Sequence, residues 1–243
     1  MAAQKGPRIL TWDLETAGVR GLCADQGYIV CFGYKFLGDE KPKVLTLLDY
    51  PGKNCQDDRE LLKAAQEIMC QADLLVAHYG DKFDRPYLET RLLISKLPPI
   101  PIVRQVDTCY HAQKRLKLSS NRLGNLAAVL GVKTPKMEKR GGWPSWWMGA
   151  LRGDEKSIRL MAAYCAIDVQ CLEECYLRMR HVIPQQYLYN HAIGSKLLQC
   201  GTCGAGSHKV HSKGYYVSDK RIWKRYECRS CWRTWKANKP EPV

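Results

Sequence analysis

The 243-residue sequence predicts an α/β fold with a mixed five-stranded sheet flanked by helices, followed by a small module held by four cysteines. Two observations predict the first part: three strand-like segments come first, and helical and strand-like segments then alternate. A third observation predicts the second part, because two Cys-x-x-Cys pairs lie near the end of the sequence. The hydrophobic fraction of 45% is typical of a globular core and excludes wholesale disorder.

Hydrophobic periodicity gives the order of the elements. Strands are expected at residues 8–13, 28–37, 43–48, 73–78 and 102–108. Helices are expected at residues 58–72, 121–130, about 154–180 and about 185–198. We expect Asp57 and Glu60 to form a capping box at the first helix. Asn121 and Gly131 are expected to cap the start and the end of the second helix.

Three acidic motifs follow one another along the predicted α/β part. They are Asp13-Leu-Glu15 at the end of the first strand, Phe83-Asp84 after the fourth, and Tyr164-Cys-Ala-Ile-Asp168 on the long helix. Each alone has an ordinary explanation: an exposed strand end, a helix cap or a buried structural acid. Together they can converge at one edge of the sheet as four carboxylates. Such an oxygen-rich pocket suits Mg²⁺ or Mn²⁺, and two such ions can hold both oxygens of a phosphodiester displacement.

These motifs resemble the three exonuclease motifs of the DEDDy 3′–5′ exonucleases. The last two look closest to the proofreading domains of family B DNA polymerases and to small phage-type relatives. The match covers about residues 8–180, with 71 residues from Asp13 to Asp84 and 84 from Asp84 to Asp168. The resemblance implies an RNase H-like fold, with Asp13, Glu15, Asp84 and Asp168 as ligands of two Mg²⁺ or Mn²⁺ ions. It also implies that Tyr164 orients or helps to activate the nucleophilic water.

One feature supports this subgroup and another departs from it. The subgroup with a catalytic histidine would carry that residue near Tyr164, but the sequence has no histidine between His111 and His181. The second motif of the family usually carries an asparagine shortly before the Phe-Asp pair, and His78 or Tyr79 occupies that neighbourhood here. Because the four carboxylates are all present, we still expect activity. The positioning of substrate or water near Asp84 is expected to differ from the family pattern.

Two further segments are candidates for contact with nucleic acid. Residues 114–122 place cations before and within a helix start, which suits phosphates, and the candidates are Lys117, Asn121 and Arg122. A solvated basic face is the alternative. Residues 141–147 cluster three tryptophans in a Gly/Pro-rich loop, where Trp146 is a candidate for stacking on an unpaired base. Packing against the body of the protein is the alternative.

The last cysteines predict one structural zinc site. Cys200, Cys203, Cys228 and Cys231 form two Cys-x-x-Cys pairs with 24 residues between them, which suits tetrahedral Zn²⁺. The segment resembles a zinc ribbon over about residues 198–236. His208 and His211 lie between the pairs, so a mixed Cys/His site is the alternative. The other eight cysteines are expected to be ordinary reduced thiols.

The charge of the chain is concentrated at this end. Residues 200–243 carry 10 Lys+Arg and 3 Asp+Glu, which supplies +7 of the total formal charge of +14. Basic and aromatic residues interleave there, as in surfaces that bind single strands. The candidates are Lys224, Arg225, Trp232 and Arg233. The alternatives are a purely structural ribbon or one that binds another protein, such as a replication or repair protein.

The expected organisation is an exonuclease domain at residues 1–184, a connecting helix at 185–199 and the zinc ribbon at 200–243. The expected activity is 3′–5′ exonuclease action, on DNA in preference to RNA and on single strands or 3′ ends, releasing nucleoside 5′-monophosphates. The alternatives are an RNA-trimming or structure-specific nuclease of the same fold, or an inactive nucleic-acid-binding or partner-recruiting module. Because the sequence shows no signal peptide and no apolar run of membrane length, we expect a reducing cytoplasmic location without a membrane partner.

Overall fold

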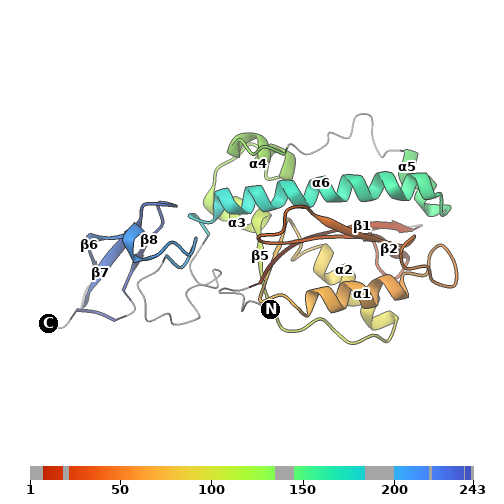
Figure 1. Cartoon of the computed structure of the whole chain (residues 1–243), viewed down its shortest axis with the longest axis horizontal. Helices are drawn as coiled ribbons and strands as arrows, with labels where there is room; N and C mark the ends of the chain where they lie inside the picture. Colours follow the sequence, from red (N-terminus) through yellow and green to blue (C-terminus); the bar gives the residue numbers. More distant parts are fainter. Residues whose placement is uncertain are drawn as a thin grey trace. The chain divides into compact units, whose positions relative to one another are not determined.

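A computed structural model describes residues 8–18, 22–134, 145–183, 200–218, 221–237 and 239–241 (Figure 1). The chain divides into two compact units, one at Arg8–Leu177 and one that contains Arg178–Val243. The expected connecting helix at 185–199 lies outside the described residues.

Five strands form a mixed sheet in the first unit, in the order β3-β2-β1-β4-β5. They are β1 (Ile9–Gly18), β2 (Gly27–Phe36), β3 (Lys43–Thr46), β4 (Leu74–Ala77) and β5 (Arg104–Asp107). Strand β2 pairs antiparallel with both β1 and β3, whereas β4 lies parallel to β1 and to β5. This arrangement confirms the predicted mixed five-stranded sheet.

Helices cover both faces of this sheet. They are α1 (Arg59–Met69), α2 (Asp84–Ile94), α3 (Thr108–Arg115), α4 (Leu123–Leu130), α5 (Ser145–Leu151) and α6 (Glu155–Met179). Figure 1 shows α6 along one face, with α1 and α2 on the other. A glycine at position 33 of β2 allows α6 to come close, because a Cβ there would lie 2.5 Å from the Cys165 sulfur. Among the described residues, no helix combines the length and apolarity of a membrane span.

Two expectations about element boundaries are wrong. Strand β1 continues to Gly18 because β2 pairs with it that far, so Asp13 and Glu15 lie inside the strand and not at its end. Trp146 lies on helix α5 and not in a loop. Helix α3 was not expected, because its sequence is mostly polar. Asp107 caps it by accepting a hydrogen bond from the Tyr110 amide, and this Asp was the available signal.

The expected helix caps are correct at one position only. Gly131 ends α4 in the left-handed conformation with φ 60°, as predicted. The residue at the start of α4 is Arg122 and not Asn121. At α1 the capping residue is Asp58, without a side-chain capping bond. The Asp58 carboxylate instead accepts hydrogen bonds from Arg91 and from the Ile29 amide, so it ties α2 and β2 to the start of α1.

The second unit contains a small antiparallel sheet in the order β6-β7-β8. Its strands are β6 (Val210–Ser218), β7 (Arg221–Cys228) and β8 (Thr234–Lys236). The buried residues of its core cluster are Cys200, Val210 and Cys228. So small a core agrees with a module that depends on a bound metal for its stability.

Candidate active site and cysteine cluster

One pocket of about 260 Å³ brings together the residues of all three acidic motifs. Its lining includes Asp13 and Glu15 from β1, Asp84 from the first residue of α2, and Tyr164 and Asp168 from α6. Glu15, Asp84, Tyr164 and Asp168 are buried, and Asp13 is half-buried. The predicted convergence of these five side chains is therefore present, whereas their catalytic and metal-binding roles stay predictions.

The register of β1 explains how the first motif reaches this pocket. Asp13 is the cross-strand partner of Gly33, whose missing side chain makes room for α6, so Asp13 lies on the α6 face of the sheet. The ladder between β1 and β4 runs only from Ile9 to Thr11 on the β1 side. Beyond it, the Leu14 amide donates to Oδ1 of Asp84 at 3.2 Å. Because β4 ends before β1 does, the edge of β1 beyond Thr11 is left unpaired by β4, and Asp84 of the second motif binds there.

A cysteine that the sequence analysis did not single out also lies beside the first motif. The ligand atoms of Asp13, Glu15 and Cys165 all lie within 4.8 Å of one another. Burial, followed by the charges of Asp13 and Glu15, raises the pKa of the Cys165 thiol well above its usual value, so the thiol is protonated at neutral pH. Its sulfur lies 3.8 Å from the backbone oxygen of Asp13. The only sequence signal was its place directly after Tyr164.

Aromatic side chains from α5 fix the surroundings of Tyr164. The rings of Trp146 and Trp147 stack with centroids 4.6 Å apart, and both contact the Tyr164 ring, at 5.7 and 6.2 Å. The Trp147 indole N–H donates to the Thr16 carbonyl oxygen at 3.0 Å, which ties α5 to β1. Trp147 lines the acidic pocket, and Trp146 packs against the core cluster of the sheet. The position of Trp146 therefore favours packing against the body of the protein over stacking on a base.

A second hollow of about 510 Å³ adjoins the acidic pocket and shares Asp13, His78, Tyr79 and Asp168 with it. Its lining also includes two of the three predicted phosphate-binding candidates, Asn121 and Arg122. The third, Lys117, is exposed between α3 and α4 and does not line this hollow.

The departure from the family pattern before Phe83 has a defined geometry. Tyr79 adopts a left-handed backbone with φ 66°, although its side chain is large, and it is 49% exposed beside both pockets. The buried Asp107 carboxylate accepts hydrogen bonds from the amides of Tyr79 and Asp81, which holds this turn. The His78 ring lies 2.9 Å from the Thr108 hydroxyl. His78 and Tyr79, the two residues of this neighbourhood, both line the acidic pocket.

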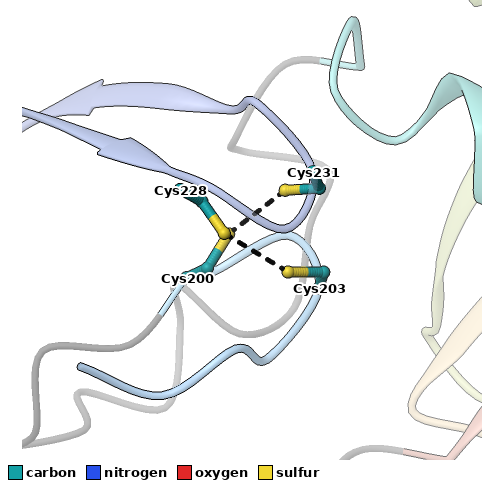
Figure 2. Close-up of side chains that lie close together, drawn as sticks. All are labelled: Cys200, Cys203, Cys228 and Cys231. Carbon is teal, nitrogen blue, oxygen red and sulfur yellow. Dashed lines mark hydrogen bonds between the residues drawn. The ribbon is translucent and has the colours of Figure 1, made fainter. Parts of the chain in front are cut away.

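The four C-terminal cysteines form a compact cluster (Figure 2). The sulfurs of Cys200 and Cys231 lie 3.5 Å apart, those of Cys203 and Cys228 lie 3.6 Å apart, and all four lie within 4.8 Å of one another. The two turns match, because the residue after each pair, Gly204 or Trp232, has a positive φ. Within the described residues this cluster contains cysteines alone, which favours the all-cysteine site over the mixed one. The cluster suggests a zinc site.

The predicted nucleic-acid contacts of the ribbon lie in different surroundings. Trp232 is 71% exposed. Arg225 is exposed on β7, and its guanidinium donates two hydrogen bonds to the Lys213 carbonyl oxygen, at 3.0 and 2.9 Å. Lys224 is half-buried. Arg233 is half-buried and donates a hydrogen bond to the His181 carbonyl oxygen. The Arg233 guanidinium is thus already engaged within its own unit.

Comparisons with known proteins agree with this architecture. A model of the RNase H superfamily matches residues 10–180. The structure of the family B DNA polymerase from the hyperthermophilic archaeon Pyrobaculum calidifontis is similar over 72% of this chain, with a TM-score of 0.55 and 15% sequence identity. The match spans 25% of that polymerase chain, so it supports the fold alone. The sequence matches no curated protein.

Proposed function

The chain belongs to the RNase H superfamily, whose members are typically nucleases, and on that premise we propose that it is a two-metal-ion 3′–5′ exonuclease. Its substrate would be nucleic acid, DNA in preference to RNA, entering as a single strand or a 3′ end. The products would be nucleoside 5′-monophosphates. The observation that carries the proposal is the single pocket lined by the four carboxylates and the tyrosine of the three motifs.

The donor set of this pocket fits hard divalent cations. Three of its carboxylates, those of Glu15, Asp84 and Asp168, are at most 6% exposed. Buried carboxylates that share one small pocket repel one another unless protons or cations neutralise them. Carboxylate oxygens are the ligands that Mg²⁺ and Mn²⁺ prefer. We therefore assign Asp13, Glu15, Asp84 and Asp168 as the residues that would hold two such ions.

Bound ions would supply two things: a lower pKa for the attacking water and neutralisation of charge on the scissile phosphate. In the proposed reaction, water attacks phosphorus, the bond from phosphorus to the 3′ oxygen of the preceding nucleotide breaks, and a proton passes to that oxygen. Tyr164 would orient the attacking water through its hydroxyl group. The packing of Trp146 and Trp147 on the Tyr164 ring supports this role, because a fixed ring fixes its hydroxyl.

The neighbouring hollow would take the strand that leads to the reacting phosphate. Asn121 and Arg122 line it, and Arg122 begins α4, so a cation and the amides of a helix start meet there. Lys117 would add a cation outside the hollow. In the second unit we propose one structural Zn²⁺ held by Cys200, Cys203, Cys228 and Cys231, with the ribbon holding nucleic acid or a replication or repair protein.

A panel of labelled oligonucleotides tests the proposed activity. Single-stranded, duplex and branched DNA and RNA, each labelled at the 3′ or the 5′ end, are incubated with the protein and Mg²⁺. We expect the 3′ label to appear as a mononucleotide at the first time points, and the 5′ label to remain on a ladder of shortening strands. Internal cuts would refute the exonuclease proposal and favour a structure-specific nuclease.

Two further outcomes are informative. Faster trimming of RNA than of DNA would reverse the proposed substrate preference and leave the mechanism in place. Binding of every strand with no cleavage in Mg²⁺ or Mn²⁺ would refute the enzyme and favour a binding or partner-recruiting module. The Asp84→Asn variant, purified in the same way, serves as the control, because hydrolysis by a contaminating nuclease would remain in that preparation.

A further inference from the structure

The hairpin of β6 and β7 has two chemically different faces. In a strand, alternate residues point to opposite faces, and residues directly opposite on paired strands share a face. Tyr216 pairs with Trp223, and Arg225 pairs with Lys236 of β8. These pairs, with Arg221, belong to one face, which we call the cationic face: Tyr216, Arg221, Trp223, Arg225 and Lys236. The other, the apolar face, carries Tyr215, Val217, Ile222, Lys224, Tyr226 and Trp235.

The apolar face belongs mainly to the core of the ribbon. Tyr226 and Trp235 pack against the cluster around the cysteines, with their ring centroids 5.8 Å apart. Beyond them the face carries exposed apolar side chains of the hairpin, Val217 and Ile222. Among the residues that the strand register assigns to the apolar face, Lys224 is the cation. This face therefore offers little to a polyanion.

The cationic face gathers positive charge at a cost to the ribbon. Arg225 and Lys236 are direct cross-strand partners, and both are exposed. Like charges directly opposite one another destabilise a sheet. The acid on this face, Glu227, is paired with Lys213 at 3.1 Å, so it does not neutralise them. Arg225 donates two hydrogen bonds to the Lys213 carbonyl oxygen, which hold its guanidinium on the hairpin without neutralising its charge. An anion bound across the strands would relieve the remaining repulsion.

Aromatic rings accompany these charges. The Lys236 ammonium lies 4.0 Å from the centroid of the Trp223 ring and 4.9 Å from that of Tyr216. The two rings lie 5.7 Å apart, and Tyr216 is 47% exposed. A phosphate that binds Lys236 would thus bring its adjoining bases to two aromatic rings. Cations beside exposed rings are the combination that binds single strands without sequence preference.

We propose that the cationic face binds single-stranded nucleic acid, with Arg221, Arg225 and Lys236 on the phosphates and with Tyr216 and Trp223 against the bases. The proposal deepens the proposed function, on which it rests for the identity of the strand: the strand held here would be the one that the nuclease site shortens. It also excludes Lys224 from the contact, although the sequence grouped that residue with Arg225.

Matched variants of the full chain test this proposal. The affinity for a 5′-labelled 20-nucleotide oligo-dT is measured by fluorescence anisotropy in buffer without Mg²⁺, at several salt concentrations. Tyr216→Ala should weaken binding about five-fold to 100-fold through the loss of one stacked base, and Tyr216→Phe should restore most of the affinity. Lys236→Gln should reduce the salt slope by about 0.7, as expected for one lost phosphate contact, whereas Lys224→Gln should leave it near the wild-type value.

Heparin, a polyanion without bases, separates stacking from charge. Tyr216→Ala should bind heparin as the wild type does. Equal losses for heparin and oligo-dT would overturn the stacking part, and equal effects of Lys236→Gln and Lys224→Gln would overturn the assignment of the face. Zinc content is measured for each variant. If Tyr216→Ala loses zinc, the comparison of Lys236→Gln with Lys224→Gln decides the proposal.

This result is separable from the nuclease activity. Binding is measured without Mg²⁺, so its outcome does not depend on hydrolysis, and hydrolysis is measured separately with the labelled oligonucleotide panel. If no variant and no wild-type sample hydrolyses any strand, the proposed function fails while the binding pattern still tests the face. If hydrolysis proceeds and the binding pattern is absent, the face proposal fails alone.

Discussion

The Leu14 amide donates a hydrogen bond to Oδ1 of Asp84 at 3.2 Å, and both residues are buried. The bond joins the middle of β1 to the first residue of α2, so the second acidic motif is held directly by the backbone of the first. The Asp84 carboxylate is therefore anchored to the main-chain amide of the residue that follows Asp13. Two substitutions of Asp84 can therefore distinguish the effect of its charge from the effect of this hydrogen bond.

Asp84→Asn removes the charge and keeps an oxygen that accepts from Leu14. We expect Mg²⁺-dependent hydrolysis to fall about 100-fold or more, because one group that positions and neutralises the reacting phosphate is lost. Asp84→Ala should be equally inactive but less stable than Asp84→Asn by about 1–3 kcal/mol, because it leaves the buried Leu14 amide without an acceptor. Hydrolysis rates and urea unfolding of the two variants check this. Equal stability would contradict the structural role of the bond.

Divalent cations should stabilise the first unit of the wild type. A ligand at 100 times its dissociation constant stabilises the folded state by about 2.7 kcal/mol, so the melting temperature should rise as Mg²⁺ or Mn²⁺ is added. Asp84→Asn should melt higher than the wild type in metal-free buffer, because less charge is crowded in the pocket, and should gain less from Mg²⁺. Calorimetry without a chelator, which would also remove zinc, measures both. An equal rise in melting temperature for both proteins would mean that the cation binds outside the acidic pocket.

Tyr164→Phe should separate the chemical step from metal binding. The ring keeps its packing against Trp146 and Trp147, and only the hydroxyl that would orient water is lost. We expect kcat to fall about 100-fold, with KM and the thermal gain from Mg²⁺ near wild-type values. Tyr176→Phe removes another buried hydroxyl from the same helix, outside the pocket lining, and serves as the control. An active Tyr164→Phe variant would leave Tyr164 a packing role only.

Loss of the cysteine cluster should unfold the ribbon alone. Cys203→Ser removes one of four sulfurs that lie within 4.8 Å of one another, so the zinc content should fall from about one atom per chain. Metal binding supplies about 10–16 kcal/mol in model zinc fingers, and the ribbon has little core to replace it. The unit at Arg8–Leu177 has its own core and should keep its melting transition. Elemental analysis and calorimetry check both statements.

The sequence predicted the sheet well because its signals are local. Apolar strands and helical stripes depend on neighbouring residues, and the order of the elements then restricts the topology. The convergence of Asp13, Asp84 and Asp168 was also predictable, because the order of the elements determines where the strand of Asp13, the strand before Asp84 and the helix of Asp168 lie in the fold. The cluster of four cysteines was predictable from the spacing of the two Cys-x-x-Cys pairs alone.

Other features depend on contacts between distant residues and could not be predicted in this way. The extension of β1 to Gly18 is caused by its pairing with β2, and Asp58 forgoes a capping bond because Arg91 and the Ile29 amide engage it. The fit of Cys165 to Gly33 joins residues on two elements far apart in the sequence. The two faces of the ribbon hairpin depend on register, which a bulge between Ser212 and Tyr215 shifts by an amount that no local pattern states.

A buried ion pair between Lys35 and Glu173 gives the last prediction. Their atoms lie 2.6 Å apart with both side chains 6% exposed, and the pair ties β2 to α6, the helix that carries Tyr164 and Asp168. Lys35→Met should destabilise the protein by about 3–5 kcal/mol, because it leaves the Glu173 carboxylate buried without its cation. Lys35→Met combined with Glu173→Leu should recover most of this loss, since two apolar side chains then pack together. Urea unfolding of the single and double variants measures the effect. A single variant as stable as the wild type would mean that water reaches Glu173, and α6 would then be held mainly by its apolar contacts.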